Sequence, residues 1–249
     1  MYEGYLELEG KKLPKTLLGT SPFIGAAQFG HRARLYQLDL YQKPENMAKI
    51  IKKSYQMGVR GIQLLPYPNL IEALKVSQKD GYNMEIIGTI LPEQEDKDIN
   101  LLAGLDASAM LLHAMITDRT DWNFIAEKLE SITDFGAIPG LVTHTPFRTT
   151  RKLIESPIKN LFQLYMMPVN RLGYLMDCDT YGPNERFELQ KLIQKLKKKI
   201  IAKKLLAAGI MTPEDAFDYL KGLDYVDMVT VGIASEDEAQ DTFENLKKK

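Results

Sequence analysis

The sequence predicts a (β/α)8 TIM barrel, in which eight parallel strands alternate with helices. Short apolar stretches such as "GIQLLP", "AMLLH", "GLVTH" and "VDMVTVG" each precede a segment with helical periodicity. Repeated strand–helix units imply a parallel sheet covered by helices. About eight such units fit within 249 residues, which is the usual size of one barrel. We therefore expect a single domain spanning residues 1–249.

Each expected strand is a short apolar run that ends at a polar residue, a glycine or a proline. The eight strands are expected near 16–20, 60–65, 84–91, 108–113, 138–143, 161–167, 199–203 and 227–231. Before the first strand, residues 4–14 alternate apolar and polar side chains around Gly10-Lys11. This pattern is typical of a β-hairpin, so we expect an N-terminal hairpin ahead of the barrel.

The helices are indicated by apolar residues at helical spacing and by capping residues at their starts. They are expected near 45–57, 69–79, 97–105, 121–132, 149–155 and 184–197, with the last two helices beginning at Thr212 and Ser235. Thr212 is followed by a proline and two acids, and Ser235 has Glu238 three residues later, as in a capping box. The long segment 25–46 follows the first strand, so we expect it to lie as a loop over the active face.

Composition excludes several classes of function. The formal net charge is −1, so no overall field favours nucleic acid or an anionic membrane. Cys178 is the single cysteine, and no apolar stretch approaches 18 residues. We expect a cytoplasmic protein that binds a small-molecule substrate, with neither a nucleic-acid nor a membrane partner. The many Lys and Glu residues hint at a thermophilic source, and the oligomeric state is open.

Two histidines are the leading catalytic candidates. His113 and His144 follow the expected strands 4 and 5, and the carboxyl ends of the strands form the active face of a barrel. Adjacent strands lie roughly 5 Å apart, so the two imidazoles can act as an acid–base pair or share a metal. A metal needs a third ligand, for which the loops offer His31, Asp177, Cys178 and Asp179.

Other polar residues near the strand ends are candidates with alternatives. Tyr67 is either a proton donor or a packing residue in its Pro-Tyr-Pro turn. Gln63 is expected to hydrogen-bond substrate, and Asn170 either binds substrate or makes a turn. Arg34, in the long segment, clamps an anionic group or lies on a mobile surface.

Lys203 and Lys204 lie at the end of strand 7, and one of them is expected to face inward. A lysine in a barrel can form a Schiff base if burial lowers its pKa. An ordinary anion-binding or surface lysine is the alternative.

Several stretches resemble the aldo-keto reductases, and they occur in the order found in that family. They are "LEGKKLPKTLLGTSPFIG", "GVRGI", "ASAMLLH", "MMPVNRLG", "IIAKKLLAAG" and "VDMVTVGIASEDEAQDTFENL". Each piece is weak alone, but together they cover most of the chain. The chain is therefore similar to a divergent member of this superfamily, whose fold is a TIM barrel.

This resemblance implies reduction of a carbonyl compound with NADH or NADPH, by a catalytic set of Asp, Tyr, Lys and His. Only the His is matched, as His113. Gln63 stands at the Asp position, Pro68 at the Tyr position with Tyr67 next to it, and Ile90 at the Lys position. Without the lysine, a tyrosine keeps a pKa near 10 and is a poor acid.

The resemblance also implies a cofactor site, with Lys203 and Ser235 as candidate cofactor-binding residues. The family's Ser-Asn that holds the nicotinamide amide is replaced by Thr143-His144, and its strand 6 Gln by Met166. Where the family has an arginine for phosphate, this chain has three acids at 236–238. Acids at a helix N-terminus repel phosphate. We therefore expect them to weaken the binding of NADP, which has an additional phosphate, more than that of NAD.

We therefore expect a nicotinamide-dependent oxidoreductase in which His113 polarises a small carbonyl compound and Tyr67 or His144 supplies the proton. One alternative is a lyase, isomerase or metal-assisted hydrolase that uses His113 and His144. Another is a barrel that binds a ligand without catalysis. The fold cannot decide among them, because barrels host unrelated chemistries.

Overall fold

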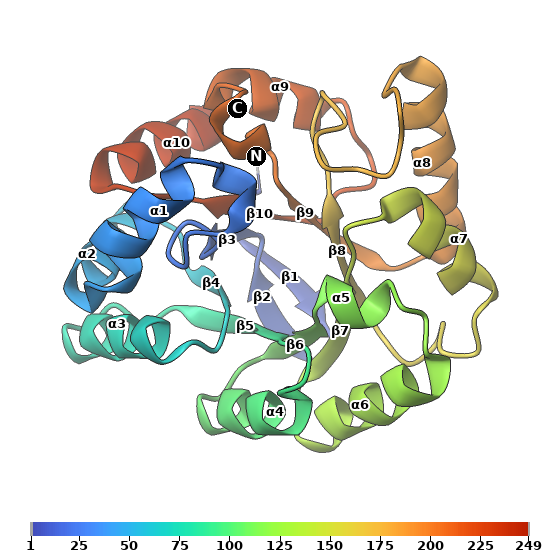
Figure 1. The fold of residues 1–249 in the computed structure, drawn as a ribbon, viewed down its shortest axis with the longest axis horizontal. Helices are drawn as coiled ribbons and strands as arrows, with labels where there is room; N and C mark the ends of the chain where they lie inside the picture. Colours follow the sequence, from blue (N-terminus) through green and yellow to red (C-terminus); the bar gives the residue numbers. More distant parts are fainter. Residues whose placement is uncertain (1, 249) are drawn as a thin grey trace.

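A computed structural model describes residues 2–248 of the chain and shows a closed parallel barrel (Figure 1). Its strands run in chain order from β3 to β10, and β10 pairs with β3 to close the ring. They are β3 (Thr16–Gly19), β4 (Gly61–Leu64), β5 (Glu85–Ile90), β6 (Ala109–Leu112), β7 (Ile138–Val142), β8 (Leu164–Pro168), β9 (Lys199–Lys203) and β10 (Met228–Gly232). The expected TIM barrel is confirmed.

An N-terminal hairpin precedes the barrel, as expected. Strand β1 (Tyr5–Leu8) pairs with β2 (Lys11–Pro14), and both lie behind the centre of the ring in Figure 1. Leu13 of β2 is fully buried and joins the side chains that fill the barrel interior. These interior residues include Leu17, Leu111, Leu164 and Met228. The hairpin therefore closes the amino-terminal end of the barrel. The end formed by the carboxyl ends of the strands stays open to a ligand.

Helices surround the strands and bury one face each against them. They are α2 (Pro44–Gln56), α3 (Pro68–Lys79), α4 (Glu95–Gly104), α6 (Trp122–Asp134), α7 (Pro146–Glu155), α8 (Pro183–Leu196), α9 (Pro213–Lys221) and α10 (Glu236–Lys248). In α2 the buried residues Met47, Ile50 and Ile51 recur at helical spacing. A second, larger apolar cluster fills the layer between strands and helices. No helix within residues 2–248 is long and apolar enough to cross a membrane.

Several segments differ from the expected pattern. Strand β8 begins at Leu164 rather than 161, because the backbone N–H of Leu161 donates to Ile158 in a turn. The first ladder bond comes only at Gln163, which donates to Pro139. The segment 25–46 is not an irregular loop, since it contains η1 (Ala27–Phe29), α1 (Arg32–Tyr36) and η2 (Gln37–Tyr41) ahead of α2. A four-residue helix, α5 (Ala114–Thr117), also follows β6.

Candidate functional site

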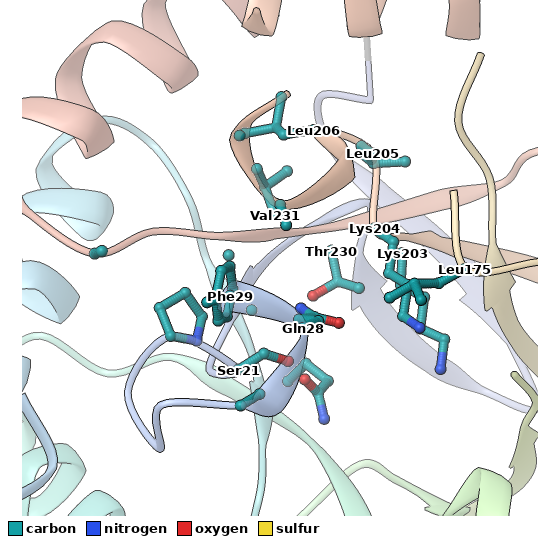
Figure 2. Close-up of a pocket in the computed structure, with 18 of the residues that line it drawn as sticks. Ser21, Gln28, Phe29, Leu175, Lys203, Lys204, Leu205, Leu206, Thr230 and Val231 are labelled. Carbon is teal, nitrogen blue, oxygen red and sulfur yellow. The ribbon is translucent and has the colours of Figure 1, made fainter. Parts of the chain in front are cut away.

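A cavity of about 850 Å³ opens at the carboxyl ends of the strands. This size lies toward the upper end of the range of small-molecule and cofactor sites, about 300–1,000 Å³. Its inner end is the barrel mouth, lined by Gln63, Thr89, His113, His144, Lys203 and Thr230. Its outer end runs past the loop after β9 to Glu238 and Asp241 on α10. Figure 2 shows part of this lining, with Gln28 and Phe29 from η1 on one side.

The two histidines lie together at the mouth. Their ring centroids are 5.6 Å apart and the rings are perpendicular, with His113 after β6 and His144 after β7. The Nδ1 atom of His113 accepts a hydrogen bond from the backbone N–H of Met115 at 3.2 Å, which caps α5. An accepting Nδ1 leaves the proton of a neutral imidazole on Nε2. His113 can therefore donate an Nε2–H hydrogen bond to a ligand.

Both histidines are held neutral at pH 7. Burial and, second, the charge of Lys203 lower the pKa of His113 to about 4. Burial and the charges of Lys203 and Lys204 lower the pKa of His144 to about 3. A neutral imidazole polarises a carbonyl by hydrogen bonding but is a weak source of protons. Neither histidine is therefore a ready proton donor at pH 7.

A carboxylate that follows α5 fixes the ends of the neighbouring strands. Asp118 accepts hydrogen bonds from Thr143 Oγ1 at 2.5 Å, from Thr149 Oγ1 at 2.7 Å and from the His144 backbone N–H at 2.9 Å. These bonds position His144 against α5. They also use the hydroxyl proton of Thr143, which is no longer available to a ligand. No sequence pattern indicates Asp118, because its partners come from separate segments of the chain.

The lysines at the end of β9 both line the cavity. Consecutive side chains in a strand point to opposite faces, so the sequence predicted that one of them faces inward. Lys204, however, has a left-handed backbone with φ of 59°, and this turn brings both side chains to the same side. Figure 2 shows them directed into the cavity together.

Neither lysine ammonium forms an ion pair or hydrogen bond within residues 2–248. Burial lowers the pKa of Lys204 to about 8, with Asp118 opposing the shift at longer range. Burial and the Lys204 charge lower the pKa of Lys203 well below its ordinary value. The mouth thus contains two acidic ammonium groups that lack a counter-charge in direct contact.

Two further polar side chains face the mouth. Gln63 donates from Nε2 to Thr89 Oγ1 at 2.8 Å, which orients its amide. Thr230 is 6 % exposed, and its hydroxyl is buried without a hydrogen-bond partner within residues 2–248. Buried hydroxyls normally have partners, so the lone Thr230 hydroxyl is an exception among the residues that line the cavity. The sequence analysis did not single out this threonine.

The segment 25–46 forms one wall of the cavity and is tied to the opposite wall. Tyr174, from the loop after β8, donates from its hydroxyl to the carbonyl of Gln28 at 3.0 Å. Arg32 donates to the carbonyl of Ala208, in the loop after β9. Both residues bridge loops that are far apart in the sequence. These two bonds hold the wall in place over the mouth.

Four predicted site residues lie outside the cavity lining. Tyr67 packs edge-on against Tyr41 with centroids 6.1 Å apart, and burial raises its pKa. Asn170 is 1 % exposed and uses its amide within one turn, accepting from Leu172 and Tyr174 and donating to Tyr174.

Arg34 lies outside the lining, whereas Arg32, two residues earlier, lines the cavity. Ser235 caps α10 by accepting from Glu238 N at 3.1 Å. The roles predicted for these four residues therefore lack a contact with the mouth.

The part of the chain that the structure describes brings no metal site together. Within residues 2–248, no group of three His, Cys, Asp or Glu side chains is placed to hold a metal ion. Asp177, one of the expected third ligands, instead accepts from the backbone N–H groups of Phe147 and Arg148 at the start of α7. The predicted metal-assisted alternative therefore lacks a ligand set in this arrangement.

The outer end of the cavity is acidic. Glu238 and Asp241 line it from the first turns of α10. Glu238 also accepts from the backbone N–H of Ala234 at 2.8 Å, so this amide is already bonded. A helix start that carries three acids in its first turn is a poor phosphate site.

Solved structures share this fold. The chain has the barrel of the aldo-keto reductases. A candidate aldo-keto reductase from Pseudomonas aeruginosa matches with a TM-score of 0.64 and 15% identity, over 100% of this chain and 96% of that one. An aldo/keto reductase from Brucella melitensis matches with a TM-score of 0.63 and 11% identity, over 97% and 92% of the two chains.

A third match is Gox0644, of which a point mutant was solved in complex with NADPH. The TM-score is 0.64 at 9% identity, over 98% of this chain and 88% of that one. No protein-family model matches the chain, and no curated protein is similar to it in sequence. At these identities the matches show the fold alone.

Proposed function

We propose that this protein is an oxidoreductase that uses NAD to interconvert a small carbonyl compound and its alcohol. The observation that carries the proposal is the continuous cavity joining the histidine pair at the barrel mouth to two acids on α10. A dinucleotide is an elongated ligand with a reactive end and an adenosine end. The cavity offers a polar, reactive end and a separate outer end in one space.

The residues at the outer end fit NAD rather than NADP. Glu238 and Asp241 can accept hydrogen bonds from the ribose hydroxyls of NAD. The same carboxylates repel the additional phosphate of NADP, and the sequence of α10 contains no arginine to bind it. The carboxamide at the reactive end cannot use Thr143, whose hydroxyl is committed to Asp118. Gln63 and Gln28 are the side-chain amides that line the cavity instead.

The inner residues divide the chemistry between them. A bound reduced nicotinamide supplies the hydride. His113 donates its Nε2–H to the carbonyl oxygen and stabilises the charge that develops there. Lys203, whose charge acts strongly on both histidines, donates the proton that this oxygen takes up. Tyr67 is not needed as the acid.

Cofactor titration tests the proposal. We expect saturable NADH binding in the micromolar range, at least about tenfold tighter than NADPH, measured by reduced-nicotinamide fluorescence. In a Glu238→Gln/Asp241→Asn variant the two affinities should converge, because the repulsion is removed while hydrogen-bonding atoms remain. Glu236→Gln, on the same first turn but outside the cavity lining, is the matched control. Absence of binding up to millimolar, or preference for NADPH, would overturn the proposal.

A further inference from the structure

We infer that Lys203, Lys204 and Thr230 form a binding site for a carboxylate on the substrate, so that the natural substrates are small oxo acids. The substrate class rests on the proposed carbonyl chemistry. The anion site itself rests only on the three side chains and the cavity that they share.

The charges at the mouth are unbalanced. Two ammonium groups lie on one wall, and within residues 2–248 neither contacts a carboxylate. Asp118 is engaged by three other donors, and Glu238 and Asp241 lie on α10 at the other end of the cavity. Like charges in a half-buried place are costly unless an anion joins them. The arrangement therefore favours an anionic ligand at this wall.

Thr230 adds a hydroxyl next to the lysines. Val229 of β10 pairs with Ala202 of β9, so Thr230 and Lys203 occupy the following positions on adjacent strands. The Thr230 hydroxyl has no partner within residues 2–248, and it is buried against Gly19. A Cβ at Gly19 would lie 2.9 Å from this oxygen. Ammonium and hydroxyl donors together suit the two oxygens of a carboxylate.

The position of Lys203 links this anion to the carbonyl. Lys203 lines the same cavity as His113 and His144, and its charge lowers the pKa of both imidazoles. An ammonium has three N–H donors. Lys203 can therefore contact a carboxylate oxygen and an adjacent carbonyl oxygen at once, which is the arrangement of atoms in a 2-oxo acid.

Binding an anion here should be coupled to proton uptake. The titratable groups that face Lys203 are Lys204, His113, His144 and, at longer range, Asp118. The pKa of Lys203 is well below its ordinary value in the free protein, and a carboxylate in contact raises it again. Anion binding should therefore be accompanied by proton uptake. Affinity should decline as pH rises above about 8, where Lys204 loses its charge.

Calorimetric titration without nicotinamide tests the site. We expect 2-oxobutanoate to bind saturably, with heats in different buffers reporting proton uptake, and butanone, which lacks the carboxylate, to bind at least about tenfold more weakly. Lys203→Met and Lys204→Met should each weaken 2-oxobutanoate about tenfold or more. Lys203→Arg, which keeps the charge, should bind much better than Lys203→Met, and the exposed Lys152→Met is the control. Equal binding of both ketones would overturn the inference.

Two further measurements separate this site from its rivals. If the lysine variants weaken ADP-ribose but leave 2-oxobutanoate unchanged, the lysines serve a dinucleotide pyrophosphate and the inference is wrong. If cyanoborohydride traps a covalent adduct on Lys203, the amine is a nucleophile and the inference is also wrong. Proton-coupled 2-oxobutanoate binding without NADH binding would support the anion site while overturning the proposed function.

Discussion

His113 combines a structural and a chemical role in one side chain. Its Nδ1 caps α5 and its Nε2–H is left for a ligand. His113→Ala should lower kcat for NADH-dependent carbonyl reduction about 10²–10³-fold, as loss of a single oxyanion donor does, and cost about 1 kcal/mol of stability through the lost cap. His113→Asn restores a capping oxygen, so only activity should be lost. Steady-state kinetics and urea unfolding of both variants measure the two effects.

The two neutral histidines also predict how stability depends on pH. Their folded pKa values, about 4 and about 3, lie below the ordinary value of 6.5, so the unfolded chain binds more protons between these limits. Stability from this source is complete above about pH 6.5 and is lost as pH falls toward 4. The loss is on the order of 1 kcal/mol for each histidine once solvent screening is included.

Urea unfolding at pH 7 and pH 5 measures this effect against the His113→Asn/His144→Asn variant. The variant should lose less stability than the wild type over this interval, because its two substituted positions no longer titrate. Equal losses would show that the histidines do not resist protonation in the folded protein.

At the residue scale, sequence reasoning found the groups that end strands and missed those whose placement depends on distant segments. His113, His144, Gln63 and Lys203 follow or end apolar runs, and the structure brings all four to the mouth. Lys204 joins them through a backbone turn that no pattern of residues indicated.

Among the elements, the segment from η1 to η2 is the one most dependent on side-chain bonds to other loops. Tyr174→Phe and Arg32→Met remove its bonds to the loops after β8 and β9. We expect amide exchange over residues 27–41 to accelerate about twofold to tenfold for each lost bond, since a net hydrogen bond contributes about 0.5–1.5 kcal/mol. Mass-spectrometric hydrogen exchange measures this, with Tyr5→Phe in the hairpin as control. Acceleration across the whole barrel would contradict a local role.

Element starts were predictable where local chemistry defines them. Thr212 accepts from Asp215 N at 3.2 Å and Pro213 begins α9, as the sequence predicted. Ser235 caps α10 as expected, although the Glu238 carboxylate accepts its reciprocal bond from the backbone N–H of Ala234 rather than from that of Ser235. The helices within segment 25–46 were missed because they are short and bury little apolar surface, so periodicity is weak there.

At the scale of the whole molecule, the N-terminal hairpin completes the barrel core by covering the amino-terminal end of the barrel. Leu13 is fully buried among interior residues, whereas Leu8 in the same hairpin is half-buried. Leu13→Ala should cost about 2–5 kcal/mol of unfolding free energy through lost burial and the cavity that remains, and Leu8→Ala clearly less. Chemical denaturation of the two variants gives the comparison. Equal costs would mean that the hairpin is peripheral to barrel stability.

The barrel itself was predictable because strand–helix alternation recurs along the whole chain and depends on averages over many residues. The residues of the candidate site were harder to predict. Three of the four positions of the reductase catalytic set carry other residues. The groups at the mouth come from β4, β5, β9 and β10 and from the residues after β6 and β7, and only the folded chain brings them together. A fold survives many substitutions, whereas a reaction depends on a few atoms.

At Lys204, the left-handed backbone lowers the stability of the folded protein, while the side chain supplies a charged group to the cavity. A side chain at φ of 59° costs about 1–2 kcal/mol relative to glycine, so Lys204→Gly should make the loop after β9 more stable. The same change removes an ammonium group from the mouth. A screen that selects for heat resistance would therefore favour glycine at this position, and the selected protein would outlast the natural one while recognising its ligand less well.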